Sequence, residues 1–162
     1  VRTKSALFNS LSDLTPSEKI LFSWTLSPEK VVTNNEFNTP TLGRRISAIR
    51  LAIKKGWKVR LCFDPVIIYD NWEKDYGELL NKIIILLDCN NIYDITVGVF
   101  RMGQDYFQRI RKSNPHSLEY YKDYVEKNKI VTVSQDDRDR VKTLFANKLK
   151  DYIADDKIHF WI

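Results

Sequence analysis

Polar and charged side chains follow each apolar run that predicts a strand in this sequence. Lysine and arginine in such places can hold a carboxylate or phosphate, and hydroxyl groups can bond a ribose or an amino group. The carboxyl ends of parallel strands meet at one rim of a sheet, where α/β proteins bind ligands. We therefore expect a ligand site built from residues at these strand ends, which are Thr3, Lys4, Ser5, Thr25, Ser27, Asp64 and Arg101.

Two of these positions also have a structural interpretation. Ser27-Pro28-Glu29 is a common helix opening, with Ser27 as the cap, Pro28 as the first helical residue and Glu29 on the helix dipole. Asp64-Pro65 can simply end a strand and turn the chain. Both interpretations stay open at this stage.

A second candidate region combines basic and aromatic residues between positions 101 and 124. Arg101, Tyr106 and Arg109 lead this stretch, which also contains Tyr120 and Tyr121. Cations interleaved with aromatic rings suit single-stranded nucleic acid or a flipped base. Another basic run, at 44–55, is better explained as the solvated face of a helix.

Other catalytic signatures are absent from the sequence. It contains no G-x-S-x-G turn, no P-loop and no G-x-G-x-x-G phosphate loop. Its two cysteines and two histidines do not form a metal-ligand pattern, so we expect no metal site in this chain. No catalytic residue can be named from the residue types alone.

The elements that position these residues alternate between strand and helix patterns. Short β-branched and aromatic runs predict strands at 19–26, 58–63, 95–100 and 158–162. Apolar stripes of helical period predict helices from 42, 72 and 141, and shorter helices are expected at 104–112 and 118–127. Thr39 with Pro40, Asn71 and Ser134 are the expected helix starts.

This alternation predicts one α/β domain over residues 1–162 with parallel strands and flanking helices. Strands starting near 19, 58 and 95 lie 39 and 37 residues apart, which is typical of βαβ units. A closed eight-stranded barrel takes about 250 residues, so 162 residues fit a small open sheet or part of a larger barrel.

Composition narrows the protein class further. The apolar fraction of 43% is ordinary for a globular protein, and no apolar run or signal peptide suggests membrane insertion or export. We expect a cytoplasmic protein, and the net charge of +5 is compatible with a polyanionic partner such as DNA. The chain opens at Val1 without an initiator methionine, which suggests a piece of something longer.

Five segments in order resemble one known family. They are R-T-K-S at 2–5, F-S-W-T-L-S-P-E-K-V-V at 22–32, E-F-N-T-P-T-L-G-R-R at 36–45, G-W-K-V-R-L-C-F-D-P-V-I at 56–67 and N-W-E-K-D-Y at 71–76. Their succession resembles the carboxy-terminal half of the spore photoproduct lyase family, radical S-adenosylmethionine enzymes that repair a thymine dimer in spore DNA.

The resemblance implies half of a partial (β/α) barrel. The missing amino-terminal half would carry the C-x-x-x-C-x-x-C loop for a [4Fe–4S] cluster, which reduces S-adenosylmethionine to a radical that abstracts hydrogen from the lesion. By position, Lys4, Ser5, Thr25 and Ser27 would contact the cosubstrate. Matching positions that we interpret as structural are Arg45, Trp72 and Tyr76.

The sequence also departs from the family pattern. Phe37-Asn38 replaces a Pro-Gly pair, and Thr25-Leu26-Ser27 replaces Ser-Leu-Asn. The basic stretch that touches the lesion in the family has no clear match at 125–134. These departures call the thymine-dimer substrate into question more than they do the fold or the cofactor class.

Three hypotheses remain. The preferred one is the half-barrel of a lyase-like radical enzyme that acts on DNA; the others are a non-catalytic α/β nucleic-acid-binding module and a stand-alone structural domain. The enzyme hypothesis predicts an exposed apolar flank where the missing half packs, whereas a stand-alone module should have protected sheet edges.

Overall fold

The computed structural model describes residues 1–11, 13–113, 115 and 123–162. Strands and helices alternate through most of this range, and short 3-10 turns lie at Phe8–Leu11, Cys89–Asn91 and Asp155–Lys157. In chain order, the elements are β1 (Arg2–Thr3), β2 (Leu21–Thr25), α1 (Glu29–Asn35), α2 (Leu42–Lys54), β3 (Lys58–Val66), α3 (Trp72–Leu86), β4 (Asp94–Val99), β5 (Arg101–Gly103), α4 (Gln104–Ser113), β6 (Val125–Lys127), β7 (Ile130–Thr132), α5 (Gln135–Leu149) and β8 (Ile158–Trp161).

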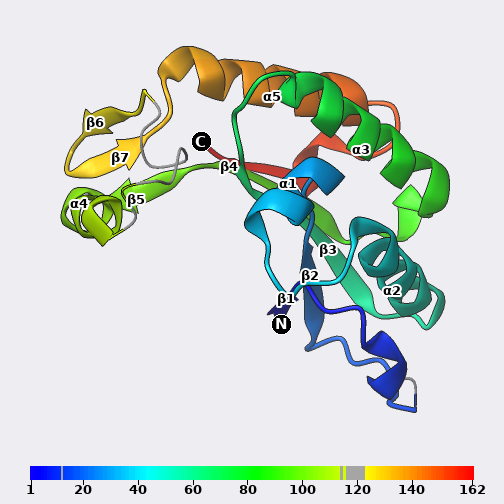
Figure 1. Ribbon diagram of the computed structural model, residues 1–162. Helices are drawn as coiled ribbons and strands as arrows, with labels where there is room; N and C mark the ends of the chain where they lie inside the picture. The colour runs from blue at the N-terminus through cyan, green and yellow to red at the C-terminus, as the bar shows by residue number, and fades with distance from the viewer. Residues whose placement is uncertain (12, 114, 116–122) are drawn as a thin grey trace.

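The described strands form a five-stranded parallel sheet in the order β1-β2-β3-β4-β8. A smaller antiparallel sheet, β5-β7-β6, follows β4 and carries α4 beside it (Figure 1). The predicted α/β class with parallel strands and flanking helices is therefore confirmed. Among the described residues, no helix is long and apolar enough to cross a membrane.

The two faces of the parallel sheet differ in chemistry. On β3, Val59, Leu61 and Phe63 are fully buried, and the strand alternation places Arg60 and Asp64 on the opposite face. Helices α2, α3 and α5 lie in an arc along one side of the sheet (Figure 1), as expected when crossovers share one hand. The helix-covered face is thus the apolar core, and we call the opposite, polar face the inner face.

Aromatic side chains join the sheet to its helices. Phe145 of α5 packs edge-on against Phe63 of β3, with ring centroids 5.1 Å apart, and lies 6.1 Å from the ring of Tyr76 on α3. All three side chains are fully buried. Because these contacts join α3, α5 and β3, they fix the helix layer relative to the strands that carry the rim residues.

Several helix boundaries differ from the sequence-based expectation. Helix α2 is capped by Thr41, whose hydroxyl accepts from Arg44 N, so the expected cap at Thr39 and helix start at Pro40 were wrong. Asn71 precedes α3 in a left-handed conformation and makes no side-chain cap. Ser134 does cap α5, as predicted, by accepting from Asp137 N at 3.1 Å.

The expected helix at 118–127 was wrong over its last residues, because Val125–Lys127 form strand β6; positions 118–122 lie outside the described residues. The helix at 104–112 is confirmed as α4. The strand predicted at 58–63 continues to Val66 through a cis Asp64–Pro65 peptide bond, so Asp64 does not end it.

Phe145→Ala should destabilise the fold strongly, because it removes a fully buried ring that contacts both β3 and α3. We expect a loss of about 3–5 kcal/mol in the free energy of unfolding, measured by urea denaturation. Tyr152→Ala is the matched control, since Tyr152 is half exposed, and it should cost less than about 0.5 kcal/mol. Equal losses in both variants would contradict this assignment of the core.

Candidate functional site

Glu36 is the centre of a polar cluster at the carboxyl end of β1 and β2. Its Oε1 lies 3.1 Å from the Lys4 ammonium nitrogen and accepts a hydrogen bond from the Ser27 hydroxyl at 3.2 Å. Its Oε2 accepts from Arg45 Nη2 at 2.6 Å. One carboxylate therefore binds residues from the first strand end, the second strand end and helix α2. We call Lys4, Ser27, Glu36 and Arg45 the rim cluster.

Arg45 is fully buried, which is unusual for an arginine, and each of its three guanidinium nitrogens donates a hydrogen bond. Besides Glu36, its guanidinium donates to Thr39 Oγ1 at 2.7 Å, to the Pro40 carbonyl at 2.9 Å and to the Thr25 carbonyl at 3.3 Å. A buried charge is tolerated only when it is paired and hydrogen-bonded in this way. Arg45 thereby ties the loop before α2 to the end of β2.

The turn that presents Glu36 explains one departure from the family pattern. Asn38 has a φ of 58°, in the left-handed region that favours glycine and that asparagine tolerates best among the other residues. The family pattern that the sequence resembles has glycine at this position. Asn38 thus allows the same turn, and the Glu36 carboxylate can reach both Arg45 and Lys4.

Two effects oppose each other on the Glu36 carboxylate. Burial disfavours its charged form, but the hydrogen bonds and charges of Arg45 and Lys4 outweigh burial and hold the pKa of Glu36 below its ordinary value of 4.5. The carboxylate is therefore ionised at neutral pH, and it keeps a negative charge beside the Lys4 ammonium group.

A second polar network lies on the inner face of the sheet. Arg101 donates to both carboxylate oxygens of Asp64, at 3.0 and 3.2 Å, and also to the Trp161 carbonyl at 3.2 Å. Arg2 donates to Thr25 Oγ1 at 3.1 Å and to the Asp64 carbonyl oxygen. These contacts join β1, β2, β3 and β8 across the inner face.

Gly98 leaves room for this network. A Cβ atom at Gly98 would lie 2.8 Å from Arg101 Nη1 and would also collide with the Asp64 carboxylate. The pair of Asp64 and Arg101 therefore occupies the space above β4 that a side chain would otherwise fill.

The other end of the inner face holds a buried carboxylate. Asp94 is 4% exposed and accepts two hydrogen bonds from Arg60, whose pKa is raised mainly by this contact. His159 Nε2 lies 3.6 Å from the same carboxyl group. A cavity of about 540 Å³ lies along this face, with Arg2, Arg60, Asp64, Thr96 and Arg101 among its lining residues.

The structure brings some of the predicted site residues together. Lys4, Thr25 and Ser27 meet around Glu36 and Arg45. The Ser5 hydroxyl accepts from Leu7 N at 3.0 Å, and the Ser5 carbonyl accepts from Trp24 Nε1 at 2.9 Å, so Ser5 shapes the turn after β1. Of the two interpretations of Ser27, the one as a helix cap was wrong, because Pro28 holds the N-cap position of α1.

The predicted nucleic-acid residues divide between two places. Arg101 belongs to the inner-face network. Tyr106 and Arg109 lie on α4, where the Arg109 guanidinium stands 5.7 Å from the centre of the exposed Tyr106 ring. The sequence analysis did not single out Glu36, Arg2 or Asp94. The one signal for Glu36 was its place as the first residue of the Glu-x-x-Thr segment, which matches an element of the family pattern.

The residues present do not fit an iron–sulfur cluster. Cys62 is buried in β3, where burial raises the pKa of its thiol, and Cys89 lies in the short turn before β4. Among the described residues, no group of three or more His, Cys, Asp or Glu side chains is arranged to hold a metal ion. That another part of a longer polypeptide holds the cluster stays a prediction.

Glu36→Gln should destabilise the fold in a pH-dependent way. A carboxyl group whose pKa is lowered on folding contributes stability above its unfolded value of 4.5, and this contribution is lost as the pH falls through the lower folded value. At pH 7 we expect a loss of about 1.5–3 kcal/mol, typical of a hydrogen bond to a charged group.

Urea denaturation of both proteins between neutral and acidic pH checks this prediction. The difference between them should shrink as the pH falls below 4.5. Glu18→Gln is the control, since Glu18 is 86% exposed and its loss should have little effect at any pH. A difference for Glu36→Gln that does not vary with pH would contradict the role of its charge.

Comparisons with known proteins agree with the geometry. The chain matches the family model described as spore photoproduct lyase over residues 1–161. It is 30% identical over 80 residues to the spore photoproduct lyase of Clostridium acetobutylicum, a match covering 49% of this chain and 24% of that protein. The lyase of Bacillus subtilis is 29% identical over 94 residues, covering 58% and 28%.

Solved structures show the same fold. A spore photoproduct lyase complexed with dinucleoside spore photoproduct superposes with a TM-score of 0.75 at 18% identity, covering 98% of this chain and 49% of that one. A double mutant with bound AdoMet and dinucleoside spore photoproduct gives a TM-score of 0.76 at 16% identity, with the same coverage. The chain thus spans about half of the solved enzymes, and it belongs to the spore photoproduct lyase family.

Proposed function

We propose that this chain is the carboxy-terminal part of a radical S-adenosylmethionine enzyme that repairs thymine dimer lesions in DNA. The observation that carries the proposal is the rim cluster: Lys4, Ser27 and Glu36 gather at the carboxyl ends of parallel strands, where such folds bind ligands. The similar solved enzymes, one with AdoMet and lesion bound, support it.

Lys4, Ser5, Thr25 and Ser27 form the part of the cosubstrate site that this chain supplies. S-adenosylmethionine offers a carboxylate, an amino group and ribose hydroxyls, which match an ammonium donor and hydroxyl partners. The Lys4 side chain is 39% exposed while paired with Glu36, so it is oriented and still accessible to a ligand carboxylate. When bound next to a reduced cluster, the cosubstrate supplies the radical that abstracts hydrogen from the lesion.

The cluster itself belongs to the amino-terminal half of the enzyme in this proposal. Several large apolar side chains within residues 1–20 are exposed, and we take them to support a missing neighbour. Val1 is 73% exposed and Leu7 is 70% exposed, and Leu14 and Ile20 are also exposed. The enzyme hypothesis predicts exposed apolar residues of this kind, and these exposures support the proposal.

The DNA strand is contacted by Arg101 and by the exposed face of α4. An aromatic ring beside a guanidinium, as in Tyr106 and Arg109, provides a stacking surface together with a phosphate partner. Arg2 on the inner face has a side chain that is 52% exposed. It adds a positively charged group to the surface that the DNA strand follows in this proposal.

Lys4→Ala should weaken binding of S-adenosylmethionine by the full-length enzyme by a factor of about 10 to 100, since one charge-assisted hydrogen bond is worth about 1.5–3 kcal/mol. Equilibrium dialysis with labelled cosubstrate measures the dissociation constant. Lys82→Ala, a change of the same charge on the exposed side of α3, should leave it unchanged. Unchanged binding in Lys4→Ala would contradict the proposed cosubstrate site.

Arg109→Ala should reduce the salt dependence of single-stranded DNA binding. Loss of one phosphate contact lowers the slope of log K against log salt by about 0.7. Arg50→Ala on the exposed side of α2 removes the same charge and should leave the slope unchanged. Equal effects of the two changes would indicate binding through net charge rather than through α4.

A non-catalytic nucleic-acid-binding module is the second candidate, favoured by the exposed Tyr106–Arg109 pair alone. The two functions are distinguished by anaerobic reconstitution of the full-length protein with iron and sulfide, S-adenosylmethionine and a lesion-containing oligonucleotide. Repair of the lesion supports the enzyme. Binding of the oligonucleotide without repair, by a protein that holds its cluster, would favour the module.

A further inference from the structure

The cavity of about 540 Å³ on the inner face of the sheet carries an excess of positive charge. The charged side chains that line it are Arg2, Lys19, Arg60, Asp64 and Arg101. Arg60 is balanced by the buried Asp94, which accepts two hydrogen bonds from it. Asp64 is the one carboxylate among the described lining residues, and two arginines share it, so the cavity attracts anions.

Asp64 holds two guanidinium groups beside each other near the carboxyl end of β3. Its two carboxylate oxygens accept from Arg101 at 3.0 and 3.2 Å, and Arg2 Nη1 lies 3.6 Å from Oδ2. The Asp64 side chain is 16% exposed, whereas those of Arg2 and Arg101 are 52% and 43% exposed. The carboxylate is thus the more buried partner, and both cations remain accessible from the cavity.

Both arginines keep donors that a ligand can use. Arg101 Nε and Arg2 Nη1 make no hydrogen bond with the other described residues. Guanidinium groups recognise phosphate through neighbouring N–H groups that lie in one plane. Because one carboxylate balances only one of the two arginines, a phosphate between them would balance the other.

A tryptophan ring lies at the same end of the cavity. Strand alternation on β8 places Trp161 on the same side as His159, which lies 3.6 Å from the inner-face residue Asp94. Trp161 pairs with Gly98, above which Arg101 lies, and its carbonyl accepts from Arg101 at 3.2 Å. Trp161 lines the cavity and is 61% exposed. An exposed aromatic ring beside fixed cations suits a nucleotide, whose base stacks while its phosphate is bound.

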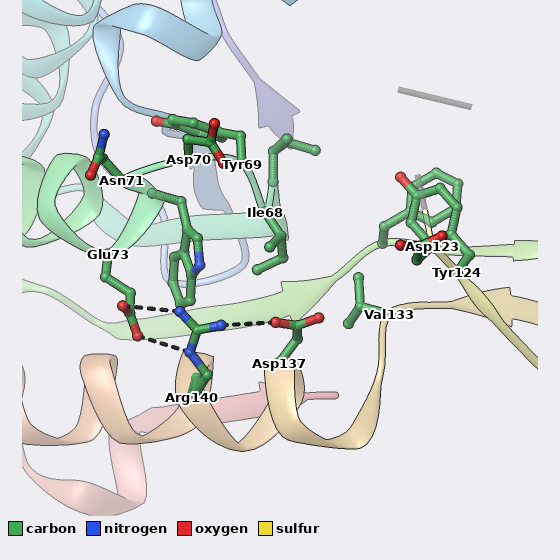
Figure 2. A pocket seen from close by; sticks show the side chains of 13 residues that line it. Ile68, Tyr69, Asp70, Asn71, Glu73, Asp123, Tyr124, Val133, Asp137 and Arg140 are labelled. Atoms are coloured by element: carbon green, nitrogen blue, oxygen red, sulfur yellow. Dashed lines mark hydrogen bonds and ion pairs between the residues drawn. The ribbon is translucent and has the colours of Figure 1, made fainter. Parts of the chain in front are cut away.

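Another cavity of similar size has the opposite charge. It measures about 590 Å³ and lies between the start of α5 and the segment that joins β3 to α3. Figure 2 shows Arg140, which lines it, held between Glu73 and Asp137, and the carboxylates of Asp70 and Asp123 also line it. Since carboxylates repel phosphate, the charges favour the inner-face cavity as the place for a nucleotide.

We propose that the inner-face cavity binds one nucleotide unit of a DNA strand, with its phosphate between Arg2 and Arg101 and its base on the ring of Trp161. This inference rests on the proposed function, in which the strand follows the inner face, and it adds a fixed anchor for one phosphate. The ligand class is therefore a nucleotide rather than a nucleoside. None of the four residues assigned to the cosubstrate lines this cavity, so the two ligands occupy different sites.

Calorimetric titration of the full-length protein with thymidine 5′-monophosphate, thymidine and inorganic phosphate tests the proposal. The monophosphate should bind at least about tenfold more tightly than either of the others, a difference of about 1.4 kcal/mol, because thymidine lacks the anion and inorganic phosphate lacks the base. The double change Arg2→Gln with Arg101→Gln should remove the preference over thymidine. Trp161→Leu, which keeps both arginines, should remove the preference over inorganic phosphate.

Arg140→Gln is the matched control. The Arg140 side chain is also 43% exposed and paired with carboxylates, but it lines the other cavity, so this variant should keep both preferences. Equal affinity of the unchanged protein for the monophosphate and thymidine, or a preference that survives the double change, would overturn the proposal. Displacement of the nucleotide by S-adenosylmethionine would also overturn it, because the cavity would then belong to the cosubstrate.

Reconstitution with a lesion-containing oligonucleotide tests the proposed function separately. Repair of the lesion by a protein that binds thymidine as tightly as its monophosphate would overturn the phosphate anchor and leave the proposed function intact. A preference for the monophosphate without repair, in a protein that holds its cluster, would support the anchor and contradict the proposed function.

Discussion

The buried contact between Glu36 and Arg45 is the constraint on which the candidate site depends. Arg45 is fully buried, so its charge requires a fixed partner, and Glu36 is the carboxylate that supplies it. The same guanidinium also binds the carbonyl at the end of β2 and the loop before α2. The remaining oxygen of Glu36 then orients Lys4 and Ser27. The buried charge of Arg45 thus determines where Glu36, and with it Lys4 and Ser27, lie at the rim.

The parallel sheet adds a second constraint, because it divides the molecule into an apolar side and a polar side. Helices cover the face that carries Val59, Leu61 and Phe63, while the inner face carries Arg60, Asp64 and their partners. Charged groups on the inner face are paired across strands, which stabilises a surface that a closed barrel would enclose. This division places the inner-face network on the face of the sheet that the helices leave uncovered, with the rim cluster at the carboxyl ends of β1 and β2.

The sequence predicts the strands and the rim better than it predicts the contacts between them. Strand and helix periods locate β2, β3, β4 and α3 to within a few residues, since apolar burial determines both pattern and structure. The role of Glu36 depends on Arg45 from a later helix, and no local pattern specifies that pairing. The strand at Val125–Lys127 pairs with β7, a contact that outweighs the helical preference of its sequence.

The most direct test of the account is a double-mutant cycle on Lys4 and Glu36 in the full-length enzyme. The dissociation constant of S-adenosylmethionine would be measured for Lys4→Ala, Glu36→Gln and the double variant. If Glu36 acts by orienting Lys4, each single change weakens binding, and the double variant binds no worse than Lys4→Ala alone. Fully additive losses, or a Glu36→Gln enzyme with normal affinity, would contradict the account.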